Sequence, residues 1–301
     1  MDDHRLQTFC LVVEHGSFSK AAEAQLLTQS AVSHLIRNLE EEMGVRLLNR
    51  RGRSVVPTSA GRVFYAHARK ILGQFRKLEE AVDQITEKVR GVLPIGADQT
   101  IAGSLLTPVL YRFLLSYPEV SLHLQTGGTE RIIGYLLDGK VDIGFVDRQV
   151  PHRTLRYDLL ARDEIVLIAS DENPLAREER ISSRDLVTQP FILPPVGTGM
   201  RSCADRFFHQ RRIEPGEIRI LMTLDRPGLI VRMVRSGIGI AFVSRWSAAA
   251  GLREGTLRIL NPSGKQLHRD FFLVRGAEEN LSLATRTFYD FIREYTFFAP
   301  S

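Results

Sequence analysis

The chain has 301 residues, more than a typical single domain, so two or three domains are expected. With 44% hydrophobic and 25% charged residues, it can bury a sizeable core, which excludes a disordered tail. No apolar run is long enough to span a bilayer, and the first residues lack the basic start of a signal peptide. These patterns predict a cytoplasmic protein with no membrane partner.

The first fifteen residues and the short segment after them predict two consecutive helices. Apolar residues at three- and four-residue steps from Leu6 to Val13 are typical of an amphipathic helix. Gly16 can end this helix in the left-handed conformation, and either Ser17 or Ser19 can cap the next one. That second helix is short and runs to about Gln25.

A third predicted helix begins after Thr28, which caps it, and runs through Glu40. Short polar and amide side chains near the start of a helix can reach base edges in the major groove of DNA, and a cation further along can contact phosphate. An ordinary solvent-exposed face would show a similar composition. The residues of the predicted reading surface are Thr28, Gln29, Ser30, Ser33, His34 and Arg37.

The segment 45–58 contains two short strand-like runs on either side of a basic turn with a glycine, which predicts a β-hairpin. Its arginines, Arg50, Arg51 and Arg53, are expected to contact DNA phosphates or to enter the minor groove. The stretch 43–78 has nine basic residues and no Asp or Glu, and such a field suits a polyanion. Together the helices and the hairpin predict a winged helix-turn-helix over residues 1–58.

Several strings in this region resemble the LysR-type transcriptional regulators. They are Gly16-Ser17-Phe18-Ser19-x-Ala21-Ala22, Thr28-Gln29-Ser30-Ala31-Val32-Ser33, Ile36-x-x-Leu39-Glu40 and Thr58-x-Ala60-Gly61. Lys20 and Leu48 depart from the residues that are common in the family, but both preserve the helix pattern. The resemblance implies a DNA-binding regulator of transcription that forms dimers and often tetramers.

Residues 59–90 predict a long linker helix with an apolar seam of 3.5-residue period. A seam of this length favours pairing with the same helix of a second chain, giving a homodimer or homotetramer. The alternative is an amphipathic helix that packs only on its own domain. The residues expected to dimerise are Phe64, Ile71, Phe75, Leu78, Val82 and Ile85.

From residue 91 to the end, short apolar runs alternate with helical segments, which is typical of an α/β domain. Strands are expected at 92–97, 120–125, 141–146, 165–169, 191–193, 218–222, 238–243 and 270–274, and a last helix at 282–295. The resemblance implies a two-lobed, periplasmic-binding-protein-like effector domain. Lobe I would comprise 91–162 and 268–301, and lobe II 163–267.

Polar loops follow several of these strands, where helix N-termini offer unpaired N–H groups to a ligand. The residues expected to bind the effector are Gln99, Thr100, Gly128, Thr129, Phe145, Arg148, Thr198 and Arg201. They suggest a small anionic metabolite or an inorganic oxyanion between the lobes. Helix capping would use the same residue types, and Asp98 and Asp147 oppose an anion unless they point away.

Other functions are less well supported by the sequence. No Gly-x-Ser-x-Gly elbow, Walker loop or complete Gly-x-Gly-x-x-Gly motif is present, so an enzyme is not expected. No Cys/His cluster has metal-ligand spacing, and no cofactor is expected. A regulator without an effector, or a redox sensor that uses Cys203, remain alternatives. Cys203 has no second cysteine nearby, and the only other one is Cys10.

Overall fold

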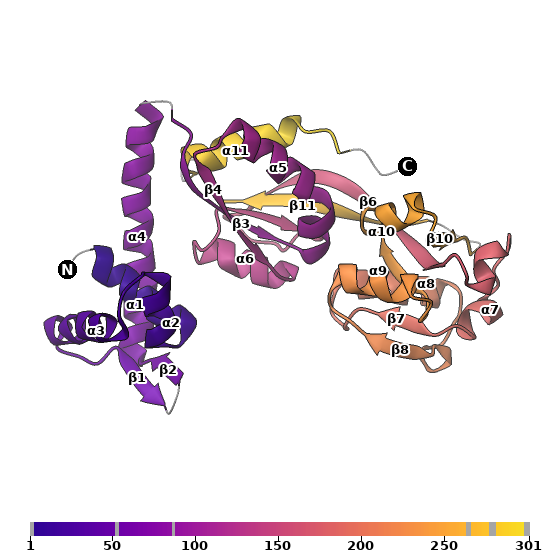
Figure 1. Cartoon of the computed structure of the whole chain (residues 1–301), viewed down its shortest axis with the longest axis horizontal. Coiled ribbons are helices and arrows are strands. Elements are labelled where there is room, and N and C mark those ends of the chain that lie inside the picture. Colours follow the sequence, from indigo (N-terminus) through magenta and orange to yellow (C-terminus); the bar gives the residue numbers. More distant parts are fainter. Residues whose placement is uncertain (1–2, 52–53, 86–87, 263–265, 277–280, 298–301) are drawn as a thin grey trace. The chain divides into compact units, whose positions relative to one another are not determined.

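The computed structural model describes residues 3–51, 54–85, 88–262, 266–276 and 281–297. The chain divides into two compact units, Met1–Lys88 and Val89–Ser301, and each is described by itself. Unit 1 therefore contains both the predicted winged module and the linker helix, and unit 2 begins within two residues of the predicted boundary at 91. Figure 1 labels the elements of both units.

Unit 1 is built from helices and one β-hairpin. Its elements are α1 (Asp3–His15), α2 (Phe18–Ala24), α3 (Gln29–Met43), β1 (Leu48–Arg51), β2 (Ser54–Pro57) and α4 (Ser59–Ile85). The two strands pair antiparallel, which confirms the predicted hairpin. The tip of the hairpin, residues 52–53, lies outside the described residues.

The helix boundaries follow from capping residues. Gly16 has a φ of +59°, and Ser17 caps α2 by accepting a hydrogen bond from the backbone of Lys20. Thr28 caps α3, and Gly44, with a φ of +65°, ends it in the left-handed conformation. The predicted caps of the second and third helices are confirmed, with Ser17 rather than Ser19 as the cap of α2.

The first part of α4 belongs to the core of unit 1. The ring of Phe64 meets that of Phe9 edge-on at 4.9 Å between centroids. Ala68, one heptad position further on, is buried against Leu6 and Cys10 of α1. Phe64 is half-buried and packs against α1, so this end of the predicted dimer seam also makes contacts within unit 1. Its role in dimerisation stays a prediction.

Unit 2 carries the remaining elements. They are β3 (Gly91–Ala97), a π-helical turn (Ile101–Leu106), α5 (Thr107–Ser116), β4 (Val120–Thr126), α6 (Thr129–Leu137), β5 (Ile143–Val146), β6 (Arg156–Ser170), α7 (Ser183–Val187), β7 (Phe191–Leu193), α8 (Gly199–Gln210), β8 (Ile220–Thr223), α9 (Pro227–Arg235), β9 (Ala241–Ser244), α10 (Arg245–Arg253), β10 (Leu257–Leu260), β11 (Leu267–Arg275) and α11 (Leu283–Glu294). Short 3-10 turns lie at Pro174–Arg177 and Pro215–Glu217.

One sheet with the strand order β10-β6-β11-β5-β3-β4 runs through both lobes, and β9 also pairs with β6. β3, β4 and β5 are parallel neighbours, whereas β11 is antiparallel to β5 and β6. The long strands β6 and β11 connect one group of helices to the other (Figure 1). β7 and β8 form a separate parallel pair.

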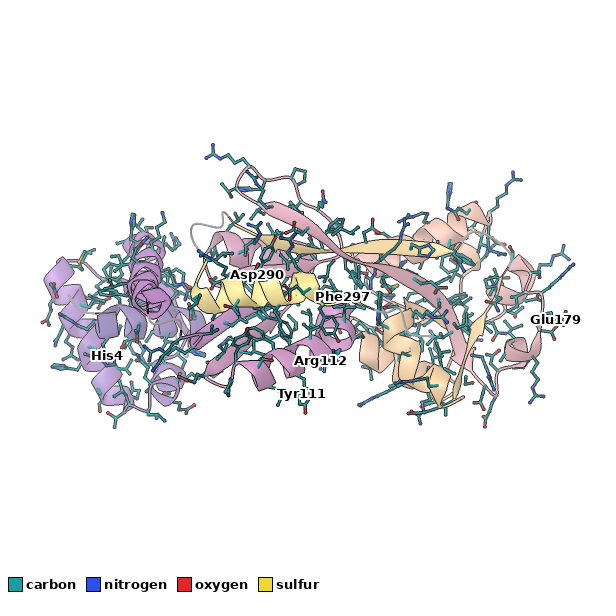
Figure 2. All side chains as sticks on the ribbon, turned by 90° about the horizontal axis from the view of Figure 1, so that it is seen from above. His4, Tyr111, Arg112, Glu179, Asp290 and Phe297 are labelled. Atoms are coloured by element: carbon teal, nitrogen blue, oxygen red, sulfur yellow. The ribbon has the colours of Figure 1, made fainter. Side chains whose placement is uncertain are left out.

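Each lobe has apolar cores on both faces of its part of the sheet. In lobe I, α5 and α11 cover one face and α6 the other. In lobe II, α7 and α8 cover one face, and α9 and α10 the other. Aromatic contacts join α5 to α11, with the rings of Phe113 and Phe288 4.9 Å apart. Figure 2 labels Arg112 on α5, whose guanidinium lies 5.4 Å from the centroid of the Tyr295 ring.

Several predicted strand bounds need correction. The strand expected at 165–169 begins nine residues earlier, at Arg156, because its first half pairs with β11. The strand predicted at 238–243 instead spans Ala241–Ser244, and β10 was not predicted. Within the described residues, no helix combines the length and apolar character needed to cross a membrane.

Candidate functional site

The exposed face of α3 carries the predicted DNA-reading side chains. Val32, Ile36 and Leu39 are buried on the opposite face, so the helix has a fixed orientation on unit 1. The exposed residues of the predicted surface are Thr28, Gln29, Ser30, His34 and Arg37, and Ser33 is half-buried.

Short hydrogen bonds order this face in the absence of DNA. The amide nitrogen of Gln29 donates to the Ser33 hydroxyl at 3.1 Å. The hydroxyls of Thr28 and Ser30 lie 3.0 Å apart. Because these bonds are exposed, base edges can replace them at small cost. The face can therefore offer amide and hydroxyl groups to the major groove.

The hairpin is held beside α3 through Leu47. One carboxylate oxygen of Glu40 accepts hydrogen bonds from the backbone N–H groups of Leu47 at 2.6 Å and Leu48 at 2.9 Å. The carbonyl of Leu47 accepts from the backbone of Thr58 at 2.9 Å. The sequence analysis did not predict this role of Glu40, which was interpreted only as the last residue of the third helix.

The predicted arginines of the hairpin can be placed only in part. Arg50 pairs in register with Val55, and Arg51 with Ser54, so both lie on strand β1. Their side chains and the whole of Arg53 lie outside the described residues. Their DNA contacts therefore stay predictions.

Beyond the body of unit 1, α4 exposes an apolar stripe. Ile71 is 40% exposed, Phe75 47% and Leu78 63%. These positions continue the predicted heptad seam, and the side chains of Val82 and Ile85 lie outside the described residues. Exposed apolar residues at this spacing are typical of a helix that pairs with another helix.

At the junction of the two lobes, a buried group of charged and polar residues surrounds Arg269. Its guanidinium donates from Nε to Asp163 at 2.8 Å and from Nη1 to Asp147 at 3.2 Å. Thr129 donates its hydroxyl to Asp147 at 2.8 Å. We call this set, Asp98, Thr129, Asp147, Asp163 and Arg269, the junction cluster.

The strand ends explain why these residues meet. Asp98 follows β3 and Asp147 follows β5, and these parallel strands end at the same edge of the sheet. Arg269 and Asp163 face each other in the β11–β6 register, where both strands pass between the lobes. The cluster therefore joins residues of lobe I to the strands that lead into lobe II.

Burial sets the protonation behaviour of the cluster. It raises the pKa of the Asp98 carboxyl, an effect that Arg269 opposes and the nearby Asp147 increases. Burial likewise raises the pKa of Asp163, again against the attraction of Arg269. A third carboxyl, that of Asp147, is 6% exposed and bound to the guanidinium. Three carboxyl groups thus compete for one cation.

The predicted effector residues divide into those near the cluster and those engaged elsewhere. Thr129 belongs to it, Gly128 is the N-cap of α6, and the backbone N–H of Thr100 donates to Asp98 at 2.8 Å. Gln99 is half-buried beside Asp98 in sequence. The ring of Phe145, by contrast, is fully buried in the lobe I core, so its prediction as an effector contact was wrong.

The remaining predicted residues are bound to other groups of the chain. Arg148 forms an ion pair with Glu130. Arg201 pairs with Asp205 at 2.8 Å and also donates to the carbonyl of Pro194. Thr198 caps α8 and donates its hydroxyl to the carbonyl of Pro195. The capping alternative therefore describes Thr198 in this structure.

A pocket of about 330 Å³ lies in lobe II, away from all of the predicted effector residues. It is lined by parts of β6 and β10 together with Phe207 and Phe242. Glu164 at its edge pairs with Arg245 at 3.2 Å. Sequence reasoning gave no sign of it.

Both cysteines are buried and free. Burial raises the pKa of the Cys203 thiol, which disfavours the reactive thiolate although Arg269 and Arg206 act in the opposite direction. This environment gives the redox alternative no support. In the described ranges, no group of three or more His, Cys, Asp or Glu residues is arranged to hold a metal ion.

Two protein families match the chain in the order of its units. Residues 4–62 match the bacterial regulatory helix-turn-helix proteins of the lysR family. Residues 86–296 match the LysR substrate binding domain. The second match alone spans more than half of the chain.

Curated relatives and solved structures agree with these matches. The chain is 28% identical to the HTH-type transcriptional activator CmpR of Synechocystis sp. over 290 residues, covering 96% of this chain and 94% of CmpR. It is 30% identical to the uncharacterized HTH-type transcriptional regulator YeiE of Escherichia coli K12, covering 95% of each chain. The structure of full-length CbnR with its target DNA superposes with a TM-score of 0.68 at 21% identity over 97% of this chain and 99% of that one. The chain belongs to the LysR family of DNA-binding transcriptional regulators with a C-terminal ligand-binding domain.

Proposed function

We propose that this protein binds specific duplex DNA as a homodimer or homotetramer and that a small-molecule effector at the junction cluster changes its activity. The main support for DNA binding is the exposed face of α3, a helix capped by Thr28, beside a hairpin with two arginines on its first strand. CbnR, whose fold this chain shares, was crystallised with its target DNA. The relatives named as regulators favour this role over catalysis, and a cytoplasmic location follows from it.

The proposal for the effector rests on the strand ends of unit 2. Asp98, Thr129 and Asp147 lie where open α/β sheets bind ligands, at the carboxyl ends of strands and next to helix N-termini. Arg269 adds a cation from the strand that passes between the lobes. We therefore place the effector at this cluster rather than in the pocket of lobe II.

The direct test of DNA binding is footprinting on the DNA beside the protein's own gene, at moderate salt. A protected region is expected, and candidate metabolites should change its extent or the protein concentration that it needs. If no duplex is protected, and selection from random duplexes also enriches no sequence, the proposed function is wrong.

Substitution of Gln29 or Ser33 by Ala should reduce discrimination between the operator and unrelated DNA. Each lost base contact is expected to remove about 1–3 kcal/mol of sequence preference, because bidentate and hydroxyl contacts to base edges carry that amount. Fluorescence anisotropy with specific and random duplexes measures the difference. Arg37→Ala is the matched comparison on the same face: it should weaken binding to both duplexes and lower the salt slope by about 1.

Substitution of Phe75 by Glu should dissociate the dimer. Phe75 is 47% exposed in the single chain, and each of two copies would bury it in a paired helix. Loss of about 1.5 kcal/mol from each copy raises the dissociation constant about 100-fold. Analytical ultracentrifugation measures this constant.

Val63→Glu provides the control for that experiment. Val63 is 62% exposed on the same helix but lies outside the heptad seam. The Val63→Glu variant should therefore remain a dimer. Equal dissociation by both variants would contradict pairing through the seam.

A further inference from the structure

The carboxylate of Asp147 lies where the predicted anionic effector would bind. It accepts the Thr129 hydroxyl at 2.8 Å at the start of α6, and Arg269 Nη1 at 3.2 Å. It also approaches α8 closely, since a Cβ atom added to Gly199 would lie 2.0 Å from Asp147 Oδ2. A carboxylate of lobe I thus reaches the N-terminus of a lobe II helix, which favours negative charge.

Arg269 retains a donor that this arrangement does not use. Its side chain is 7% exposed, and its Nη2 atom has no hydrogen-bond partner in the part of the chain that the structure describes. An unpaired buried donor costs free energy. A carboxylate that binds a guanidinium through both Nη atoms forms two parallel hydrogen bonds, a geometry that arginine favours. Such a ligand would satisfy Nη2 and take Nη1 from Asp147.

The other acidic residues leave room for this exchange. Asp163 is bound through Nε of Arg269, and its other carboxylate oxygen accepts a hydrogen bond from the hydroxyl of Ser244 at 2.7 Å. Burial raises the pKa of the Asp98 carboxyl, which disfavours its charged form and so lowers its repulsion of an anion. The two Nη atoms are therefore the part of Arg269 where a second carboxylate fits.

We propose that Asp147 is an internal ligand of the effector site, and that an effector carboxylate binds by replacing the Asp147 side chain on Arg269 and Thr129. This inference rests on the proposed function, which places the effector at the junction cluster. Because Asp147 belongs to lobe I and contacts the start of α8 in lobe II, its release removes a contact between the lobes. Ligand binding and the arrangement of the lobes are then linked, and the coupling free energy is the same in both directions.

Chemical rescue tests the inference in the full-length protein. Asp147→Ala removes the internal carboxylate and leaves the Thr129 hydroxyl and both Nη atoms of Arg269 free for a small anion. Thermal unfolding is measured in 100 mM sodium acetate or sodium formate and in sodium chloride of the same ionic strength. Acetate is expected to raise the midpoint of Asp147→Ala by about 3 °C over chloride, because it binds only the folded state.

Two controls define the result. Wild-type protein should gain little from acetate, because Asp147 holds the site at high effective concentration. Asp205→Ala also removes a carboxylate that pairs with an arginine, but this pair is on the surface of α8, where Asp205 is 53% exposed. It should gain no more than wild type. If Asp147→Ala does not fold, Asp147→Ser takes its place with the same expectation.

The inference is wrong if acetate and formate stabilise the Asp147 variant no more than wild type and Asp205→Ala. This outcome can be told apart from a failure of the proposed function, because the measurement uses no DNA. A wild-type protein that protects an operator while its Asp147 variant shows no rescue contradicts only the internal ligand. A wild-type protein that protects no DNA contradicts the function itself.

Discussion

Replacement of Arg269 by Met is expected to lower the free energy of unfolding of unit 2 by about 3–5 kcal/mol. The substitution keeps most of the side-chain volume but removes the cation that, among the described residues, bonds to the fully buried Asp163. Of the side-chain hydrogen bonds to Asp163 in the described residues, the one from Ser244 then remains. A buried carboxylate without its partner is among the most destabilising changes that a fold can undergo. Urea unfolding followed by far-ultraviolet circular dichroism measures the loss.

The loss should depend on pH in a defined direction. Burial already raises the pKa of Asp163, and removal of Arg269 takes away the attraction that opposes this rise. The folded variant then binds a proton more tightly than the unfolded chain does, so its stability decreases as pH rises through the folded-state pKa. Arg269→Met should therefore be closest to wild type at the acidic end of the pH range and furthest from it at the alkaline end.

The neighbouring pair on the same two strands provides the control. Arg162 and Asp270 face each other one register position away, with 3.5 Å between Nε and Oδ1, but Arg162 is 71% exposed. Arg162→Met should change stability by less than about 1 kcal/mol, because exposed ion pairs contribute little. A similar loss in both variants, or no pH dependence for Arg269→Met, would contradict the buried role of Arg269.

Some parts of the fold could be predicted from the sequence and others could not. The starts of the second and third helices of unit 1 were predicted because their signals are local: Gly16, Ser17 and Thr28 end or begin helices by contacts within a few residues. The third helix was predicted through Glu40 and ends three residues later, at Met43, before Gly44. The final helix is equally local, and Ser282 caps it. Such signals need no knowledge of the rest of the chain.

The junction cluster could not be predicted in this way. Asp163 and Asp147 lie 106 and 122 residues from Arg269 in the sequence, so no spacing pattern joins them. The start of β6 was missed for a related reason. Its first half is rich in charged residues and becomes a strand because β11 pairs with it. Tertiary pairing, rather than local preference, determines both features.

The loops predicted to bind the effector do lie at the ends of strands, but the sequence did not predict which groups their side chains contact. Thr129 does lie at the junction, yet its hydroxyl is donated to Asp147. The objection that Asp147 opposes an anion depended on where this side chain points. In the structure it points at Thr129, a predicted effector residue, and at Arg269, which was not predicted. Arg269 was one of 40 basic residues and had no local feature that marked it.

Replacement of Gly61 by Ala is expected to destabilise unit 1 by about 3 kcal/mol and to weaken binding to every duplex. A Cβ atom at Gly61 would lie 1.9 Å from the carbonyl oxygen of Leu47. Leu47 cannot yield easily, since its N–H is bound to Glu40 and its carbonyl to the backbone of Thr58. Relief of the overlap must therefore move the start of β1, and with it the hairpin that lies beside α3.

Gly73→Ala separates this steric effect from the helix preference of alanine. Both glycines lie in α4, but among the described atoms, leaving out the chain neighbours and the adjacent helix backbone, none lies within 4 Å of a Cβ added to Gly73. Gly73→Ala should therefore stabilise the helix by about 0.5–1 kcal/mol and leave DNA binding unchanged. Urea unfolding and anisotropy with specific and random duplexes measure both variants. Two results would contradict a hairpin positioned through Leu47: a gain of stability in Gly61→Ala, or a loss of preference for the operator with no loss of affinity for random duplexes. In either case α3 alone would account for the affinity for DNA.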